Sequence, residues 1–232
     1  MLRLIFCLLL TTSAYANDTT ARSFESFLAD IRAQAISQGI STATLDQALQ
    51  GLTPNPKVIK FDQSQAEFSQ NFWRYLGSRV SPYRLENGKK LLQKHQDTFQ
   101  HNYKKYGVPP HIIVAFWGLE TNYGSNTGNL SLVRSLATLS FDERRSAFFT
   151  EQLLTLLKLI DDNKIPLDAQ GSWAGAMGNV QFMPTNVAAY GIDADGDGKI
   201  GLWDNKADIF ASAANFLQKI GWHRGERWGR EV

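Results

Sequence analysis

Residues 111–124 read HIIVAFWGLETNYG, an apolar stretch that ends in a single carboxylate, Glu120. A Pro-Pro pair stands immediately before it and suits the first turn of a helix, where a missing backbone N–H costs little. Glu120 follows Ile113 by seven residues, Phe116 by four and Trp117 by three, so a helix brings these side chains to one face. The stretch predicts an acid at the end of an apolar helical stripe.

Such an acid loses hydration, which favours its neutral form and raises its pKa towards the range that a general acid needs. Spacing alone leaves two alternatives open. Glu120 could face outward at a frayed helix end, or it could form a structural ion pair with an arginine such as Arg144 or Arg145.

Helical spacing of apolar residues recurs along most of the chain and predicts a predominantly α fold. No alternating run of β-branched residues is long enough for a convincing sheet. Residues 57–78 are expected to form an extended stretch or turn followed by a short helix. The other expected helices are a hairpin over 23–49, one amphipathic helix over 84–106 that stops at Gly107, the helix opened by Pro109-Pro110, and segments near 132–138, 144–163, 184–190 and 205–220.

Residues 1–16 have the pattern of a secretory signal peptide, with Arg3 before an apolar run and AYA at 14–16 as a cleavage site. The run is too short to span a bilayer as a permanent helix. The only cysteine, Cys7, lies inside the run and not after it, which disfavours a lipid anchor. We expect cleavage after Ala16, a mature chain without cysteine, and a periplasmic location.

Charge and known motifs exclude several other functions. The formal net charge is +2 and falls to +1 without Arg3, so no nucleic-acid partner is implied. The sequence has no apolar run of 20 residues, so no stable membrane span is predicted. The chain lacks HExxH, P-loop and GxSxG motifs, and its four histidines have no ligand spacing.

Several segments together resemble the lytic murein transglycosylase B family. They keep the order and approximate spacing of that family, and the resemblance extends from about residue 22 to the end. The segments are GVPP at 107–110 leading into GLETNYG at 118–124, LATLSF at 136–141 followed by Arg144-Arg145, and GSWAGAMGNVQFMP at 171–184.

The resemblance implies a lysozyme-like transglycosylase fold, with an N-terminal helical region over 17–78 and a catalytic domain over 79–232. Glu120 would be the single catalytic acid. It would protonate the glycosidic oxygen between N-acetylmuramic acid and N-acetylglucosamine in peptidoglycan, then accept the proton of the muramyl C6 hydroxyl. The product would be a 1,6-anhydromuramyl end. Most glycosidases need a second carboxylate, but substrate-assisted enzymes do not.

The resemblance also implies substrate-binding residues. Tyr75 matches an aromatic subsite residue, Ser172 and Gln181 would bind the sugar or orient the acid, and Arg145, alone or together with Arg144, would reach lactyl or peptide carboxylates. Without the resemblance, Tyr75 reads as a core or rim aromatic, and Ser172 and Gln181 read equally well as local loop caps.

Residues 193–204, DADGDGKIGLWD, fit the twelve-residue EF-hand loop. Position 12 is an aspartate where the usual loop has glutamate, which predicts weaker binding or more tolerance of Mg²⁺, and the alternative is an Asp/Gly-rich turn that binds nothing. A Ca²⁺ loop occurs at this place in the resembling family, which implies a structural ion. The expected ligands are Asp193, Asp195, Asp197, the Lys199 carbonyl and Asp204.

Two rival functions remain open at this level. A hydrolytic muramidase would share the fold and the acid, and an inactive protein that binds peptidoglycan or Ca²⁺ would share the fold alone. The second rival gains weight because proteins of this family usually continue for about another hundred residues past the Gly221-Trp222 region. We therefore expect the C-terminal part of the domain to be incomplete relative to the family.

Overall fold

The computed structural model describes residues 22–64, 71–225 and 229. It is mostly helical, which confirms the predominantly α fold class. In chain order the elements are α1 (Phe24–Ser37), α2 (Thr42–Leu49), α3 (Pro56–Gln63), α4 (Phe72–Arg79), α5 (Pro82–Lys94), α6 (Gln96–Tyr106), α7 (Pro110–Thr121), β1 (Leu130–Ser131), α8 (Leu132–Phe141), the 3₁₀ turn η2 (Glu143–Arg145), α9 (Ser146–Asp161), β2 (Gln170–Gly171), α10 (Pro184–Tyr190) and α11 (Lys206–Lys219).

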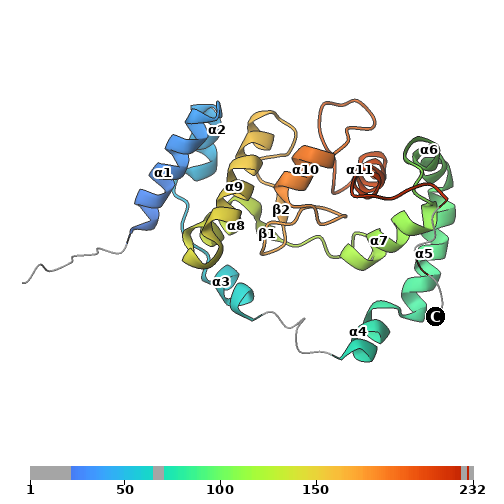
Figure 1. The fold of residues 1–232 in the computed structure, drawn as a ribbon. Coiled ribbons are helices and arrows are strands. Elements are labelled where there is room, and N and C mark those ends of the chain that lie inside the picture. The colour runs from blue at the N-terminus through green and yellow to red at the C-terminus, as the bar shows by residue number, and fades with distance from the viewer. Residues whose placement is uncertain (1–21, 65–70, 226–228, 230–232) are drawn as a thin grey trace, which may run out of the picture.

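The hairpin expected over 23–49 is present as α1 and α2. Each helix begins at a serine cap: the hydroxyl of Ser23 accepts from the Ser26 amide and that of Ser41 from the Thr44 amide. Both helices pack against α9, and α3 packs against α8 (Figure 1). The N-terminal helices therefore share one hydrophobic core with later elements, and the division of the chain at residue 78 stays a prediction.

Helices α5, α6, α7 and α11 pack together at the other end of the molecule (Figure 1). The single helix expected over 84–106 is wrong, because the chain breaks between α5 and α6 at His95. The His95 ring lies edge-on to the rings of Phe99, Trp117 and Phe210, with centroids 5.5–6.4 Å apart. This aromatic packing accompanies a backbone of φ −109° at His95, outside the helical region.

The expectation for residues 57–78 is also partly wrong. Its first part is the helix α3, where an extended stretch or turn was expected. Asn55 caps α3 by accepting from the Lys57 amide, and Pro56 occupies the first helical position. The short helix expected after it is present as α4, which begins after the Asn71 cap.

The remaining helices agree with the expected ranges in position, and α10 agrees in both of its ends. Strands β1 and β2 form a two-residue antiparallel ladder that ties the segment between α7 and α8 to the segment between α9 and α10. None of the described helices combines the length and apolarity needed to cross a bilayer. The expected signal peptide, residues 1–16, lies outside the described residues.

Candidate active site

Glu120 lies in the last turn of α7, as the sequence predicted. Pro110 occupies the first turn of this helix, and Asn122 ends it in the left-handed conformation with φ 50°. Ile113 and Trp117 are buried in the core, whereas Glu120 at the helix end reaches solvent and is only partly covered by neighbouring atoms. The apolar stripe anchors α7 in the core, and the acid lies at the end of that stripe.

Two opposing influences set the pKa of Glu120. Partial burial raises the pKa above its ordinary value, and the weaker effect of the Arg79 guanidinium lowers it. Arg79 belongs to α4 and lies over the Tyr75 ring of the same helix, with Cζ 5.3 Å from the ring centroid. Helix α4 therefore supplies a cation that acts on the acid and an exposed aromatic ring beside that cation.

Arg144 and Arg145 do not form the ion pair with Glu120 that the sequence left open. Both guanidinium groups pair with the carboxylate of Asp62 at the end of α3, whose side chain is only 3% exposed. Arg144 also pairs with Asp142 at 3.0 Å. About half of each arginine side chain stays exposed (48% and 45%), so both cations remain accessible from solvent.

Ser172 and Gln181 make local hydrogen bonds in the loop after β2. The Ser172 hydroxyl accepts from the Ala176 amide at 3.0 Å, as in the capping alternative. Gln181 has φ 49°, and its Nε2 donates to the carbonyls of Gly178 at 2.9 Å and Thr127 at 3.2 Å. Gln181 therefore ties this loop to the segment that follows the acid.

Asn179 is a central residue of the site to which sequence reasoning assigned no role. Its Oδ1 accepts from the Trp117 indole at 2.7 Å, and its backbone carbonyl accepts from the Thr121 hydroxyl at 2.8 Å. Its Nδ2 donates to the carbonyls of Leu202 at 3.0 Å and Trp203 at 2.6 Å. One buried asparagine thus fixes α7 on both sides of the acid. The available signal was an asparagine beside a glycine in an apolar run.

The EF-hand-like loop brings three of its predicted ligands together. Carboxylate oxygens of Asp193, Asp195 and Asp197 lie within 4.8 Å of one another. Desolvation raises the pKa of Asp193, but backbone amides of the loop, including that of Gly198, donate to it and lower its pKa overall. Asp204 is exposed and lies outside this group of three. Lys199 follows Asp197 in the loop, and its amide donates to that carboxylate at 2.8 Å.

Asp208 of α11 holds the backbone of this loop by hydrogen bonds, and the sequence analysis did not identify it. It is fully buried on α11 and accepts from the amides of Ala194 and Gly201, both at 2.7 Å. Desolvation raises the pKa of Asp208, the two amide hydrogen bonds partly offset that rise, and the nearby carboxylates of Asp195 and Asp193 add to it. A buried carboxylate therefore fixes the loop backbone at two points, Ala194 and Gly201.

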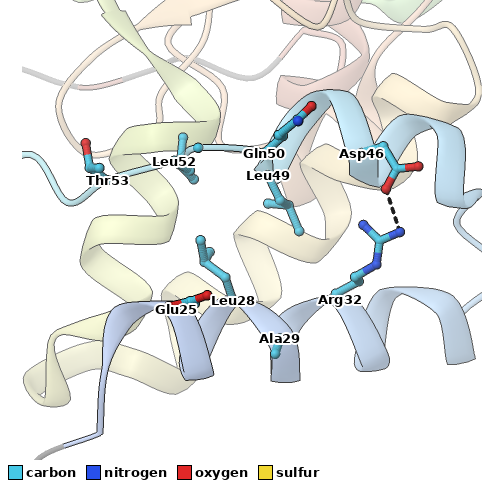
Figure 2. A pocket seen from close by; sticks show the side chains of 10 residues that line it. Glu25, Leu28, Ala29, Arg32, Asp46, Leu49, Gln50, Leu52 and Thr53 are labelled. Carbon is cyan, nitrogen blue, oxygen red and sulfur yellow. Dashed lines mark hydrogen bonds and ion pairs between the residues drawn. The ribbon is translucent and has the colours of Figure 1, made fainter.

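A separate pocket lies between α1 and the end of α2, and it contains none of the predicted site residues (Figure 2). Arg32 and Asp46 form an ion pair of 2.6 Å at one side of it. Its lining residues are Glu25, Leu28, Ala29, Arg32, Asp46, Leu49, Gln50, Gly51, Leu52 and Thr53.

Comparison with known proteins gives a consistent result. A family model described as the transglycosylase SLT domain matches residues 23–232. The chain is 39% identical over 156 residues to the membrane-bound lytic murein transglycosylase B of Escherichia coli (strain K12), covering 66% of this chain and 43% of that protein.

Solved structures give the same likeness. SltB3 from Pseudomonas aeruginosa, in complex with NAG-NAM-pentapeptide, superposes with a TM-score of 0.86 at 41% identity, covering 89% of this chain and 56% of that one. Soluble lytic transglycosylase SltB1 from the same organism superposes with a TM-score of 0.81 at 32% identity, and the match covers 87% of this chain and 69% of SltB1. Escherichia coli Slt35 in complex with calcium superposes with a TM-score of 0.75 at 33% identity, and the match covers 92% of this chain and 67% of Slt35. The chain spans about half the length of the first two relatives, 43% and 56%.

Proposed function

The chain belongs to the transglycosylase SLT domain family and within it to the lytic murein transglycosylase B family, and from this we propose that it cleaves peptidoglycan glycan strands with Glu120 as its single acid and base. The observation that carries the proposal is the carboxylate at the end of α7, whose pKa is raised by burial. A raised pKa keeps the carboxyl group protonated to a higher pH, and the protonated form can give its proton to a leaving oxygen.

The reaction needs no second carboxylate. In the first step Glu120 protonates the glycosidic oxygen, the N-acetylmuramic acid–N-acetylglucosamine bond breaks, and the acetamido oxygen of the muramyl residue bonds to C1 as an oxazolinium ion. In the second, the carboxylate takes the proton of the muramyl C6 hydroxyl as that oxygen displaces the acetamido oxygen from C1, which closes the 1,6-anhydro ring and restores the acid. Among the described residues, the charge that acts on Glu120 is the Arg79 cation, and this favours the carboxylate left after the first step.

The surrounding side chains supply groups that suit a glycan strand. The exposed ring of Tyr75 can pack against a sugar face. The hydroxyl proton of Ser172 and Oε1 of Gln181 are not used in the hydrogen bonds to Ala176, Gly178 and Thr127, so they can bind sugar hydroxyls.

A digestion experiment tests the role of Glu120. Purified protein is incubated with peptidoglycan, and soluble muropeptides are measured beside the Glu120→Gln and Glu143→Gln variants. Glu143 is an exposed carboxylate and serves as the matched control. We expect Glu120→Gln to lose activity by about 100-fold or more, and Glu143→Gln to retain it. Equal release by wild type and Glu120→Gln, or no release by either, contradicts the proposal.

Arg144 and Arg145 are proposed to bind the carboxylates of peptide-bearing substrate through their exposed edges. Arg144→Gln should then lower kcat/KM on glycan strands that carry peptides and leave it unchanged on strands whose peptides have been removed by an amidase. Asp62→Asn is the control for the loss of the buried ion pair. An equal effect of Arg144→Gln on both substrates would show that the arginine acts only through the fold.

We also propose a structural Ca²⁺ in the loop 193–204, held by the carboxylates of Asp193, Asp195 and Asp197 with the Lys199 carbonyl and Asp204. Three carboxylates within 4.8 Å of one another repel unless a cation offsets their charge, and an all-oxygen donor set suits Ca²⁺. The ion would brace the loop beside the site and takes no part in the reaction.

Thermal unfolding tests this ion. Saturating Ca²⁺ should stabilise the folded protein, by about 2.7 kcal/mol at a free concentration 100 times Kd, and Asp195→Asn should reduce that gain. Mg²⁺ at the same concentration measures the preference between the two ions. Identical melting with Ca²⁺ and with a chelator excludes the site.

Export to the periplasm is proposed from the signal-peptide pattern of residues 1–16. Its relatives are named as murein transglycosylases, and murein lies outside the cytoplasmic membrane. N-terminal sequencing of the protein recovered from cells should begin at Asn17. A protein that retains Met1 in the cytoplasmic fraction would contradict export.

A further inference from the structure

The side chain of Arg84 joins the ends of two helices, α4 and α7. Its Nη1 donates at 2.6 Å to the carbonyl of Arg79, the last residue of α4. Its Nε donates at 3.2 Å to Oδ1 of Asn122, the left-handed residue that ends α7. Because Asn122 is two residues after Glu120, one guanidinium connects the end of the acid-bearing helix to the end of α4.

The backbone of Arg84 is itself held in place. Its amide donates to the cap hydroxyl of Ser81 at 3.2 Å, and its carbonyl accepts from the Tyr123 hydroxyl at 2.9 Å. The Tyr123 ring fits between α5 and α7 only because two glycines face it. A Cβ at Gly88 would lie 2.5 Å from the Tyr123 hydroxyl, and one at Gly118 would lie 2.8 Å from the ring.

The charged groups around α7 differ in what they face. Arg79 of α4 is the cation that acts on Glu120. Lys206 of α11 lies over the Trp117 ring, 5.6 Å from its centroid, on the core side of α7. His95, between α5 and α6, is directed at the same ring. Of these three groups, Arg79 is therefore the one whose charge acts on Glu120.

We infer that Arg84 is a positioning residue for Glu120: by bonding both the Arg79 carbonyl and the Asn122 side chain, it holds the Arg79 cation and the neighbouring Tyr75 ring against the end of α7. This inference rests on the proposed function, because it assigns a task to a residue that does not touch the reacting atoms. It adds α4 to the site as a helix whose position relative to α7 is fixed.

The fixed position of α4 matters for the proton transfers of Glu120. A single carboxyl group that must first donate and then accept a proton works best when neither form is strongly favoured. Burial favours the neutral form of Glu120, and Arg79 favours the carboxylate. Coulomb energy falls with distance, so a loosened α4 would weaken the effect of the Arg79 charge on Glu120.

A titration of the Glu120 carboxyl carbon by NMR tests the inference without requiring turnover. The full chain is labelled with ¹³C at glutamate, and Glu120→Gln identifies the signal. The pKa is measured in wild type, Arg79→Gln, Arg84→Met and the double variant. We expect each single variant to raise the pKa of Glu120 by about half a unit or more, and the double variant to add nothing further.

Arg134→Met is the matched control. Arg134 also donates to two backbone carbonyls, those of Thr53 at 2.8 Å and Pro54 at 3.1 Å, but it belongs to α8 and its partners precede α3. It should leave the Glu120 titration unchanged. If Arg84→Met does not fold, as judged by circular dichroism, Arg84→Lys replaces it, since a lysine cannot bond both partners in the same geometry.

The outcomes separate this inference from the proposed function. An unchanged Glu120 titration in Arg84→Met or Arg84→Lys, with a raised pKa in Arg79→Gln, overturns the positioning role. Additive shifts in the double variant overturn it as well. On peptidoglycan, the folded Arg84 variant should lower kcat by about tenfold or more with a smaller change in KM. A wild-type protein that releases no muropeptides contradicts the proposed function alone, and the titration still decides the role of Arg84.

Discussion

The indole nitrogen of Trp117 donates a 2.7 Å hydrogen bond to Oδ1 of Asn179, which joins the acid-bearing helix to the glycine-rich loop inside the core. Both side chains are nearly inaccessible, at 2% and 1% exposure. The Asn179 side-chain amide also donates to the carbonyls of Leu202 and Trp203, which lie in the EF-hand-like loop 193–204. The position of Glu120 therefore depends on contacts from the loop after β2 and from the segment before α11.

Asn179→Ala should destabilise the fold by about 3 kcal/mol, because it leaves the Trp117 indole and two carbonyls without their buried partner. Urea unfolding followed by circular dichroism measures the change. Asn126→Ala, at an exposed asparagine, is the control and should change the free energy of unfolding by less than about 0.5 kcal/mol. Equal effects of the two substitutions would show that the network does not hold α7.

Gly128→Ala should also destabilise the protein strongly. The backbone at Gly128 has φ 86°, and an added Cβ would lie 2.1 Å from the backbone of Gly171. Gly39 has a similar φ of 79° with open space around it. The difference in melting temperature between Gly128→Ala and Gly39→Ala isolates the steric contact from the backbone strain. Indistinguishable melting temperatures would contradict the close approach of the two segments.

Much of the fold was predictable because capping residues and apolar spacing act locally. The proline pair that opens α7 and the glycine after α6 fix helix ends whatever the tertiary structure is. The break at His95 was not predictable, because it accompanies contacts with rings of α6, α7 and α11 that lie far apart in sequence. Local spacing carries no information on such contacts.

The candidate site shows the same division. Spacing placed Glu120 at the end of an apolar stripe, and the rise of its pKa through burial is confirmed. The partners of Arg144 and Arg145 were not predictable, since Asp62 lies about 80 residues earlier. The roles of Asn179 and Arg84 are likewise set by hydrogen bonds to backbone carbonyls, which leave no trace in residue type or spacing.

The stability of the protein should fall between neutral and mildly acidic pH through His95. Desolvation, and then the charges of Lys94 and Lys206, lower the pKa of this imidazole in the folded protein. The unfolded chain takes up the proton first, near its ordinary pKa of about 6.5, so stability is present above that pH and is lost as the pH falls towards the folded pKa. His95→Phe should make the free energy of unfolding depend less on pH between about pH 7 and 5. The same pH dependence in both proteins would contradict this assignment.

The mass of the glycan ends released by the protein tests the central claim most directly. Wild-type protein is incubated with peptidoglycan, and the muropeptides are separated and weighed, with Glu120→Gln as the inactive reference. If Glu120 acts as acid and then as base towards the muramyl C6 hydroxyl, the new ends are 1,6-anhydromuramyl residues, lighter than reducing ends by one water. Reducing ends in the wild-type digest would show that water attacks instead, and would contradict the transglycosylase reaction.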